Sequence, residues 1–143
     1  RKIHMLGREM SKILKHNFVC VHTPLITSLK GPGQKMSKSI PGSGISVTDS
    51  YGEIKKTING AYCPEGDITE NPILQLTKLI IFPKIDKINI KRPEKFGGDV
   101  SYDSYEKLAG DFAVKGLHPM DLKAAVVECL ENIIKPIRDG WEK

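Results

Sequence analysis

The chain has 143 residues, of which 39% are hydrophobic and 27% charged, a composition typical of a soluble globular protein with one domain or pieces of two. Its net charge of +5 favours polyanionic partners. Three widely spaced cysteines with no Cys-x-x-Cys pair argue against a disulfide framework and a zinc site, and for a reducing, cytoplasmic environment. No apolar run approaches the roughly 20 residues of a membrane helix, so no membrane association is expected.

The first 49 residues have the pattern of the end of an α/β sheet. Apolar residues spaced by three and four over residues 3–14 predict an amphipathic helix. Residues 18–21 read Phe-Val-Cys-Val, which is typical of a buried parallel strand. Ligands bind beyond the carboxyl ends of such strands, so a functional loop is expected next, followed by a short strand over 45–47. Because the chain opens on Arg1 within a helical pattern, it is expected to be a fragment.

Residues 30–44 are predicted to form a mobile surface loop, because they hold four glycines and two prolines. Residues 35–39 read Lys-Met-Ser-Lys-Ser. The ammonium groups of Lys35 and Lys38, with hydroxyl groups beside them, suit a polyphosphate whose charge grows during a reaction. The alternative is an ordinary solvated loop that happens to carry lysines.

The remaining residues predict a helical unit. Ser50 and Glu53 have the spacing of a capping box that starts a helix reaching residue 61. Asn71-Pro72 opens another helix over 73–82, since proline fits a first helical turn.

Alternating residues at 88–91 and 100–102 predict a β-hairpin with a long tip. The tip carries Phe96 beside two glycines, a poor position for a core residue. We expect the Phe96 ring to be exposed.

Two more helices complete the prediction. Asp103 and Glu106 look like a second capping box, for a helix that ends near residue 114 with Gly116 as its stop. His118-Pro119 starts the last helix. Its apolar stripe comprises Leu122, Val126, Cys129, Leu130, Ile133 and Ile137.

Phe96, His118 and Asp121 form a second candidate site. An aromatic ring and an imidazole can sandwich an unstacked base, and a carboxylate can accept hydrogen bonds from the N1–H and N2–H groups of guanine. The alternatives are a buried Phe96, a His118 that only caps the last helix, and an Asp121 placed for the helix dipole. Four basic side chains could hold the RNA backbone nearby: Lys91, Arg92, Lys95 and Lys123.

The motifs together resemble one family. Lys-Met-Ser-Lys-Ser is the signature of class I aminoacyl-tRNA synthetases. The stretches at 90–99 (Ile-Lys-Arg-Pro-Glu-Lys-Phe-Gly-Gly-Asp) and 118–123 (His-Pro-Met-Asp-Leu-Lys) look like tyrosyl-tRNA synthetases of the archaeal and eukaryotic branch, most like archaeal members. Residues 1–6 and 61–64 also fit, so the similarity covers nearly the whole chain.

The resemblance implies roles for single residues. It implies that Lys35 and Lys38 stabilise the ATP phosphates while tyrosyl-adenylate forms, within an ATP-binding loop that also contains Met36, Ser37 and Ser39. Phe96, His118 and Asp121 would hold the first anticodon base of tRNA(Tyr), a guanine. Mg²⁺ would arrive with the ATP, and no tightly bound metal is expected.

The resemblance also implies the architecture: a mainly α protein with a small β content. Residues 1–49 would be the end of a Rossmann-like catalytic domain, including the loop at 30–44, and residues 50–143 a helical anticodon-binding domain with the hairpin. The His-x-Gly-His signature and tyrosine pocket of the family do not occur in the sequence. The chain alone is therefore expected to be inactive, and the parent enzyme to be a homodimer formed through the missing part.

Two other interpretations remain open. One is a stand-alone RNA-binding module derived from a synthetase, which the mass of the natural gene product would distinguish. The other is a tryptophanyl-tRNA synthetase, which aminoacylation with tyrosine against tryptophan would distinguish.

Overall fold

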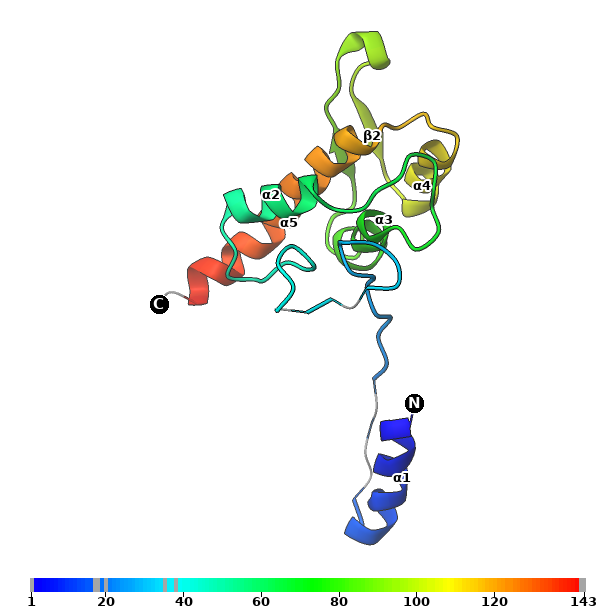
Figure 1. Ribbon diagram of the computed structural model, residues 1–143, viewed down its shortest axis with the longest axis vertical. Helices are drawn as coiled ribbons and strands as arrows, with labels where there is room; N and C mark the ends of the chain where they lie inside the picture. The colour runs from blue at the N-terminus through cyan, green and yellow to red at the C-terminus, as the bar shows by residue number, and fades with distance from the viewer. Residues whose placement is uncertain (1, 17–18, 20, 35, 38, 142–143) are drawn as a thin grey trace.

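The computed structural model describes residues 2–16, 19, 21–34, 36–37 and 39–141, and these are mainly helical with one small antiparallel sheet, as predicted (Figure 1). In chain order the elements are α1 (Lys2–Leu14), α2 (Tyr51–Asn59), α3 (Pro72–Leu76), the π-helical turn η1 (Thr77–Ile81), β1 (Ile88–Ile90), the 3₁₀ turn η2 (Glu94–Phe96), β2 (Val100–Tyr102), α4 (Tyr105–Ala113) and α5 (Pro119–Trp141).

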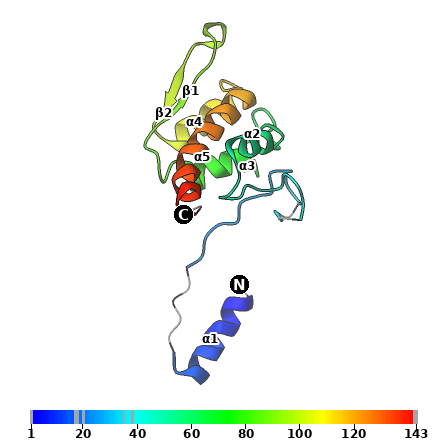
Figure 2. The same cartoon turned by 90° about the vertical axis from the view of Figure 1, so that its left-hand side faces the viewer.

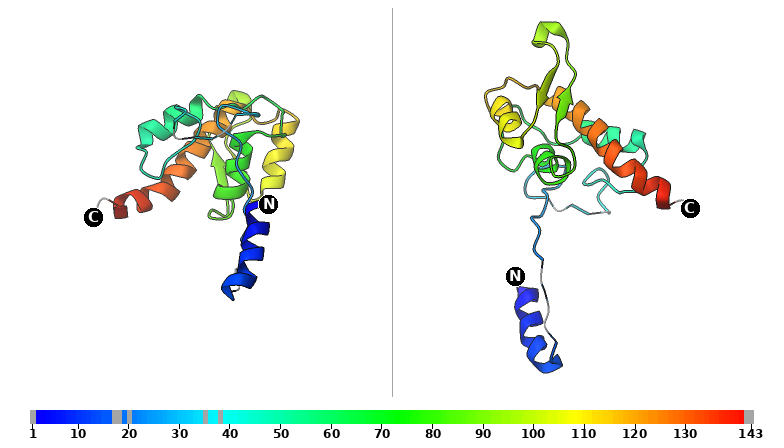
Figure 3. Two further views of the ribbon diagram at one scale, coloured as in Figure 1. Left: turned by 60° about the horizontal axis from the view of Figure 1, so that its bottom comes forward. Right: turned by 180° about the vertical axis from the view of Figure 1, so that it is seen from behind.

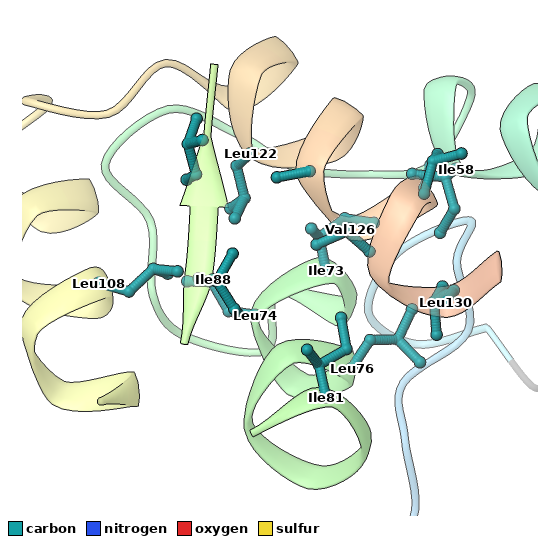
Figure 4. Packing of buried hydrophobic residues seen from close by; sticks show 14 of the residues in the cluster. Ile58, Ile73, Leu74, Leu76, Ile81, Ile88, Leu108, Leu122, Val126 and Leu130 are labelled. Atoms are coloured by element: carbon teal, nitrogen blue, oxygen red, sulfur yellow. The ribbon is translucent and has the colours of Figure 1, made fainter. Parts of the chain in front are cut away.

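The hydrophobic core forms where α2, α3 and β1 pack against α5 (Figure 4). Ile58 of α2 packs against α5, the helix that carries Val126 and Leu130, and all three side chains are buried. On the other side, Leu108 of α4 points toward Ile88 of β1. Each such side chain contributes roughly 1.5–3 kcal/mol when it leaves water. The long α5 is therefore the element on which the others are assembled.

The predicted β-hairpin is confirmed. β1 and β2 are antiparallel, with Ile88 opposite Tyr102 and Ile90 opposite Val100. Ile88 and Ile90 face the core while Asn89 between them is exposed, the alternation that a half-buried strand requires. The hairpin runs alongside the first turns of α5, and its tip projects beyond the helices (Figures 2 and 3).

Helix α1 forms where the spacing predicted it, but it stands apart from the other helices (Figures 1 and 2). Ile3 and Ile13 are 86% and 72% exposed. The apolar stripe of α1 is thus not covered by any other element in the described part of the chain. None of the helices in that part combines the length and the apolarity needed to cross a membrane.

Neither of the two short strands expected near the loop is found among the described residues. Val19 and Val21 are exposed and lie outside any strand, while residues 18 and 20 are outside the described residues. A parallel strand depends on hydrogen bonds from neighbouring strands, and the described residues place no strand beside this segment. At residues 45–47 a turn replaces the strand, because the Asp49 carboxylate accepts a hydrogen bond from the Ser46 N–H at 2.9 Å.

The helix ends agree with the sequence in part. The capping box of Ser50 and Glu53 is present at the start of α2, and Pro72 lies in the first turn of α3. The second predicted capping box is wrong. Helix α4 begins at Tyr105 after Ser104, and Asp103 instead forms an ion pair of 2.8 Å with Lys107.

The stop after α4 also differs from the prediction. Lys115, rather than Gly116, adopts the left-handed conformation, with a φ of 61°. The Gly116 N–H still closes the end of α4 by donating to the Asp111 carbonyl at 2.8 Å.

Candidate nucleic-acid interface

A pocket of about 400 Å³ lies between the hairpin tip, the connection from α4 to α5, and the first turn of α5. We call it the tip pocket. It contains all three members of the second candidate site, Phe96, His118 and Asp121, which come from separate elements. Its full lining is Glu65, Arg92, Phe96, Lys115, Gly116, His118 and Asp121.

Phe96 is exposed, as the sequence predicted, with 59% of its surface accessible. The backbone holds it in place. The Phe96 N–H donates to the Pro93 carbonyl at 2.9 Å, and Gly97 takes a φ of 94°, a left-handed conformation that glycine adopts without strain. The Lys95 ammonium lies 4.8 Å from the centroid of the Phe96 ring. An exposed ring on a fixed turn is a suitable platform for stacking.

His118 immediately precedes α5 and caps it. Its Nδ1 accepts a hydrogen bond of 3.1 Å from the Met120 N–H, which satisfies one of the free donors at the helix start. The sequence left capping and base binding open as alternatives, and this geometry allows both. In the neutral imidazole, a hydrogen bond accepted at Nδ1 places the proton on Nε2. The capping bond therefore orients the ring in the tip pocket.

Asp121 lies in the first turn of α5, where its N–H donates to the His118 carbonyl at 3.1 Å. Its side chain is half-buried and lines the tip pocket. Among the residues that the structure describes, none donates a hydrogen bond to its carboxylate. The carboxylate therefore keeps its acceptor capacity for a molecule in the pocket. Its position in the first turn also suits the dipole of α5, so the dipole alternative remains open too.

The four basic side chains expected around the site occupy different environments. Lys91 and Lys95 are exposed on the hairpin, as a phosphate contact requires. Arg92 donates to two carbonyl oxygens of the chain itself. Lys123 is only 7% exposed, and its ammonium donates to the carbonyls of Asn59 and Ala61 at 3.0 and 2.7 Å. The expectation that Lys123 contacts RNA is contradicted, because this ammonium is buried beneath the end of α2.

Glu65 and Lys115 line the tip pocket but were not predicted from the sequence. Gly66 brings their segments together. A Cβ at Gly66 would lie 3.4 Å from the Ala113 carbonyl oxygen and from the Lys115 side chain. The adjoining Glu-Gly-Asp is a recognisable turn signal, but nothing local to it shows which distant segment it will approach.

The loop at 30–44 has no helix or strand in its described residues, as predicted. It folds back on itself, because the Ser43 hydroxyl donates to the Ser37 carbonyl at 2.7 Å and the Leu29 N–H donates to the Ser43 carbonyl at 2.9 Å. The Tyr62 N–H then ties the base of the loop to the body through the Leu29 carbonyl at 2.7 Å.

A second pocket, of about 630 Å³, lies along this loop and the residues just after it. It is lined by Met36, Ser37, Ile40, Pro41, Gly42, Gly44, Ile45, Ser46, Thr48 and Asp49. Lys35 and Lys38, the predicted catalytic lysines, lie outside the described residues. Asp49 is the one carboxylate among the described lining residues, and it already accepts the Ser46 N–H.

Residues 1–135 match the family described as tRNA synthetases class I (W and Y). The chain therefore belongs to this family of class I aminoacyl-tRNA synthetases. Two similar proteins of this family are tyrosine enzymes. Tyrosine–tRNA ligase of Saccharolobus solfataricus is 42% identical over 100% of this chain, and that of Methanocaldococcus jannaschii is 50% identical over 96%. The resemblance to archaeal tyrosyl-tRNA synthetases is confirmed, and the tryptophanyl alternative is not favoured.

Solved structures agree with these relatives. The crystal structure of tyrosyl-tRNA synthetase from Archaeoglobus fulgidus, complexed with L-tyrosine, matches 97% of this chain with a TM-score of 0.87 at 48% identity, and 43% of that protein is covered. The tyrosyl-tRNA synthetase from Aeropyrum pernix matches 96% of this chain with a TM-score of 0.78 at 42% identity, and 40% of that protein is covered. The chain spans 44% and 42% of the two ligases named above.

Proposed function

We propose that the chain is part of a cytoplasmic tyrosine–tRNA ligase, which uses ATP to activate tyrosine and transfers it to tRNA(Tyr). In this proposal the tip pocket binds the first anticodon base, a guanine. The observation that carries the proposal is the convergence of an exposed aromatic ring, an oriented imidazole and a carboxylate that receives no hydrogen bond from the described residues, in one pocket of about 400 Å³. Those are the groups that recognition of a single unstacked base requires.

Stacking supplies the sequence-independent part of this recognition. The Phe96 ring projects from the hairpin, and the His118 ring lies at the start of α5. A base inserted between them keeps contact on both faces. Stacking of a base on an aromatic side chain contributes roughly 1–3 kcal/mol and tolerates every base.

Asp121 supplies the selectivity for guanine. A carboxylate accepts only, and guanine presents two donors, N1–H and N2–H, on its Watson–Crick edge. Adenine has no N2 amino group, and its N1 is an acceptor that would face the carboxylate. Guanine therefore satisfies the acceptors of Asp121, whereas adenine leaves them unsatisfied.

Exposed cations hold the RNA backbone around the base. Lys91 and Lys95 are available on the hairpin, and Lys115 lines the pocket from the end of α4. Contacts of this type position the nucleic acid without reading its sequence. The proposal does not include Lys123.

The loop at 30–44 carries the other proposed role. Lys35 and Lys38 act electrostatically on the phosphates of ATP as tyrosyl-adenylate and pyrophosphate form, because charge neutralisation dominates such chemistry. The pocket of about 630 Å³ is lined by described residues of this loop and by residues that follow it. Mg²⁺ is proposed to arrive with ATP, where it would neutralise phosphate charge.

The proposed division of labour follows the chain. Residues 1–49 belong to the catalytic domain, and residues 50–143 form the anticodon-binding domain. The exposed apolar stripe of α1 supports this division, because a face of that kind needs a core that the described elements do not provide. The parent enzyme is proposed to be a homodimer.

The test is binding of an anticodon stem-loop RNA to the full chain at a fixed salt concentration. Asp121→Ala should weaken binding of the RNA with guanine as its first anticodon base by about 1–3 kcal/mol, the scale of one good base contact. Replacing that guanine by adenine should weaken binding to the unsubstituted chain and matter little to the variant.

Asp139→Ala is the matched control, because it removes an exposed carboxylate from the opposite end of α5. It should leave both dissociation constants unchanged. An Asp121→Ala variant that binds guanine-containing RNA as tightly as the unsubstituted chain would refute the assignment.

A further inference from the structure

The two sides of the tip pocket belong to different elements, and Arg92 joins them. On the hairpin side, Arg92 Nε donates to the Gly98 carbonyl at 2.6 Å. On the helix side, Arg92 Nη1 donates to the Gly116 carbonyl at 2.9 Å. Gly98 lies just beyond Phe96, and Gly116 lies just before His118. A single guanidinium therefore spans from one stacking partner to the other.

The backbone of Arg92 is also held, and the neighbouring glycine leaves space for its guanidinium. The Arg92 N–H donates to the Asp99 carboxylate at 3.0 Å, which anchors the residue across the hairpin. Gly97 leaves room for the side chain, since a Cβ there would lie 3.2 Å from Arg92 Nη2. The planar fork of arginine presents donors in two fixed directions, whereas a lysine ammonium is one point on a flexible stem.

In the proposed function, a base stacks on both Phe96 and His118 only if the hairpin tip keeps a fixed place relative to the start of α5. Exposed hairpin tips move readily, because few buried contacts hold them. A displacement of the tip by a fraction of an ångström would alter stacking on both faces and the distance from the base edge to Asp121. Selectivity for guanine requires this geometry to be held before RNA arrives.

We propose that Arg92 is a positioning residue for guanine recognition, which holds the hairpin tip against the α4–α5 connection so that the base meets the Asp121 carboxylate. This inference rests on the proposed function of the tip pocket. It replaces the phosphate contact that the sequence suggested for Arg92. Two donors of the guanidinium are spent on carbonyl groups of the chain, so its contribution is geometric more than electrostatic.

The two roles predict different salt dependence. A side chain that neutralises one phosphate adds about 1 to the slope of log affinity against log salt concentration, and its removal lowers binding of all sequences equally. A positioning residue leaves that slope nearly unchanged. Its loss lowers the ratio of affinities for guanine over adenine.

The experiment compares Arg92→Lys with Lys91→Gln in the full chain, using stem-loop RNAs with guanine or adenine as the first anticodon base. Arg92→Lys keeps the charge and loses the fork, and it should reduce the guanine-to-adenine affinity ratio by about tenfold with an unchanged salt slope. Lys91→Gln removes the charge of the exposed lysine next to Arg92. It should reduce the slope by about 1 and leave the ratio intact.

A double variant supplies a readout that stability alone does not move. If Arg92 acts through the base contact of Asp121, Arg92→Lys combined with Asp121→Ala should lose no more discrimination than Asp121→Ala does. Additive losses would overturn the inference.

Three other outcomes would overturn it as well. The first is an Arg92→Lys variant that keeps the guanine-to-adenine affinity ratio of the unsubstituted chain. The second is an Arg92→Gln variant with a reduced salt slope and an unchanged affinity ratio. The third is loss of folded structure in Arg92→Lys, measured by circular dichroism, which would make the residue structural. An Asp121→Ala variant with unchanged affinity would instead refute the proposed function itself, so the two failures are distinguishable.

Discussion

Lys123 occupies the position where α2 ends against α5. The last carbonyl groups of a helix have no partner within it. The Lys123 ammonium donates to one such group, that of Asn59 at the end of α2, and also to the carbonyl of Ala61 just beyond the helix. A cation is also favoured there by the helix dipole. The side chain thus joins two packed helices, which explains why a lysine is buried in a position that belongs to the apolar face of α5.

Replacing Lys123 tests this role. Lys123→Met preserves much of the volume but removes the donor from the buried Ala61 carbonyl and from the part-buried Asn59 carbonyl, so the free energy of unfolding should fall by about 2–3 kcal/mol. Urea denaturation measures this change. Lys135→Met, an exposed position on the same helix, should stay within about 0.5 kcal/mol of the unsubstituted chain. Equal stability of the two variants would contradict the bridging role.

At the scale of single elements, α3 depends on a buried cap. The Asn71 side chain is completely buried, and its Oδ1 accepts hydrogen bonds from the Ile73 and Leu74 N–H groups at 3.1 and 3.3 Å. Its amide nitrogen donates to the Asp67 carbonyl at 3.0 Å. One side chain therefore starts the helix and also closes the loop that carries Glu65 to the tip pocket.

Removal of this buried cap should lower the free energy of unfolding more than removal of an exposed cap. Asn71→Ala is expected to lower the free energy of unfolding by about 2 kcal/mol, because a cap is lost and the Asp67 carbonyl is left without its donor. Chemical denaturation of Asn71→Ala beside Asn132→Ala, an exposed asparagine of α5, provides the comparison. A difference below about 0.5 kcal/mol would contradict the argument.

At the scale of the whole molecule, the hairpin is attached to the helical body by a buried phenol. Tyr102 of β2 is 3% exposed, and its hydroxyl donates to the Asp111 carboxylate of α4 at 2.8 Å. Burial, followed by the hydrogen bond to Asp111, raises the pKa of Tyr102 to about 12. The folded state therefore favours the neutral phenol, and ionisation opposes folding.

This shift predicts the alkaline limit of the fold. Because the folded pKa lies above the ordinary value of about 10, the stabilisation is complete below pH 10 and disappears as the pH rises toward 12. The free energy of unfolding should fall by roughly 2–3 kcal/mol across that interval. At pH 8, Tyr102→Phe should have a lower free energy of unfolding than the unsubstituted chain, and this free energy should change less between pH 10 and 12. Tyr62→Phe should show the same pH dependence of stability as the unsubstituted chain. A steep alkaline loss in Tyr102→Phe would contradict the assignment.

Sequence patterns predict the structure correctly where it depends on neighbours along the chain. The spacing of apolar residues located α1, α2 and α5, the Ser50 and Glu53 pair marked a true capping box, and alternation located the hairpin with its exposed Phe96. At residues 45–47 the predicted strand is absent, because the Asp49 carboxylate and the Ser46 N–H form a turn instead. Val19 and Val21 lie outside any strand, because a parallel strand needs neighbouring strands that no local pattern supplies.

The amino-acid order alone was sufficient to locate the helices, the hairpin, the Lys-Met-Ser-Lys-Ser loop and the membership of a synthetase family, because these depend on periodicity and short motifs. The environments of the basic side chains were decided only by the tertiary structure. Lys123 became buried, Arg92 became a link between two pocket walls, and Lys115 joined the pocket without any motif of its own. The physical reason is that a charged group binds whatever acceptors lie within reach, and those acceptors come from segments far away in the sequence.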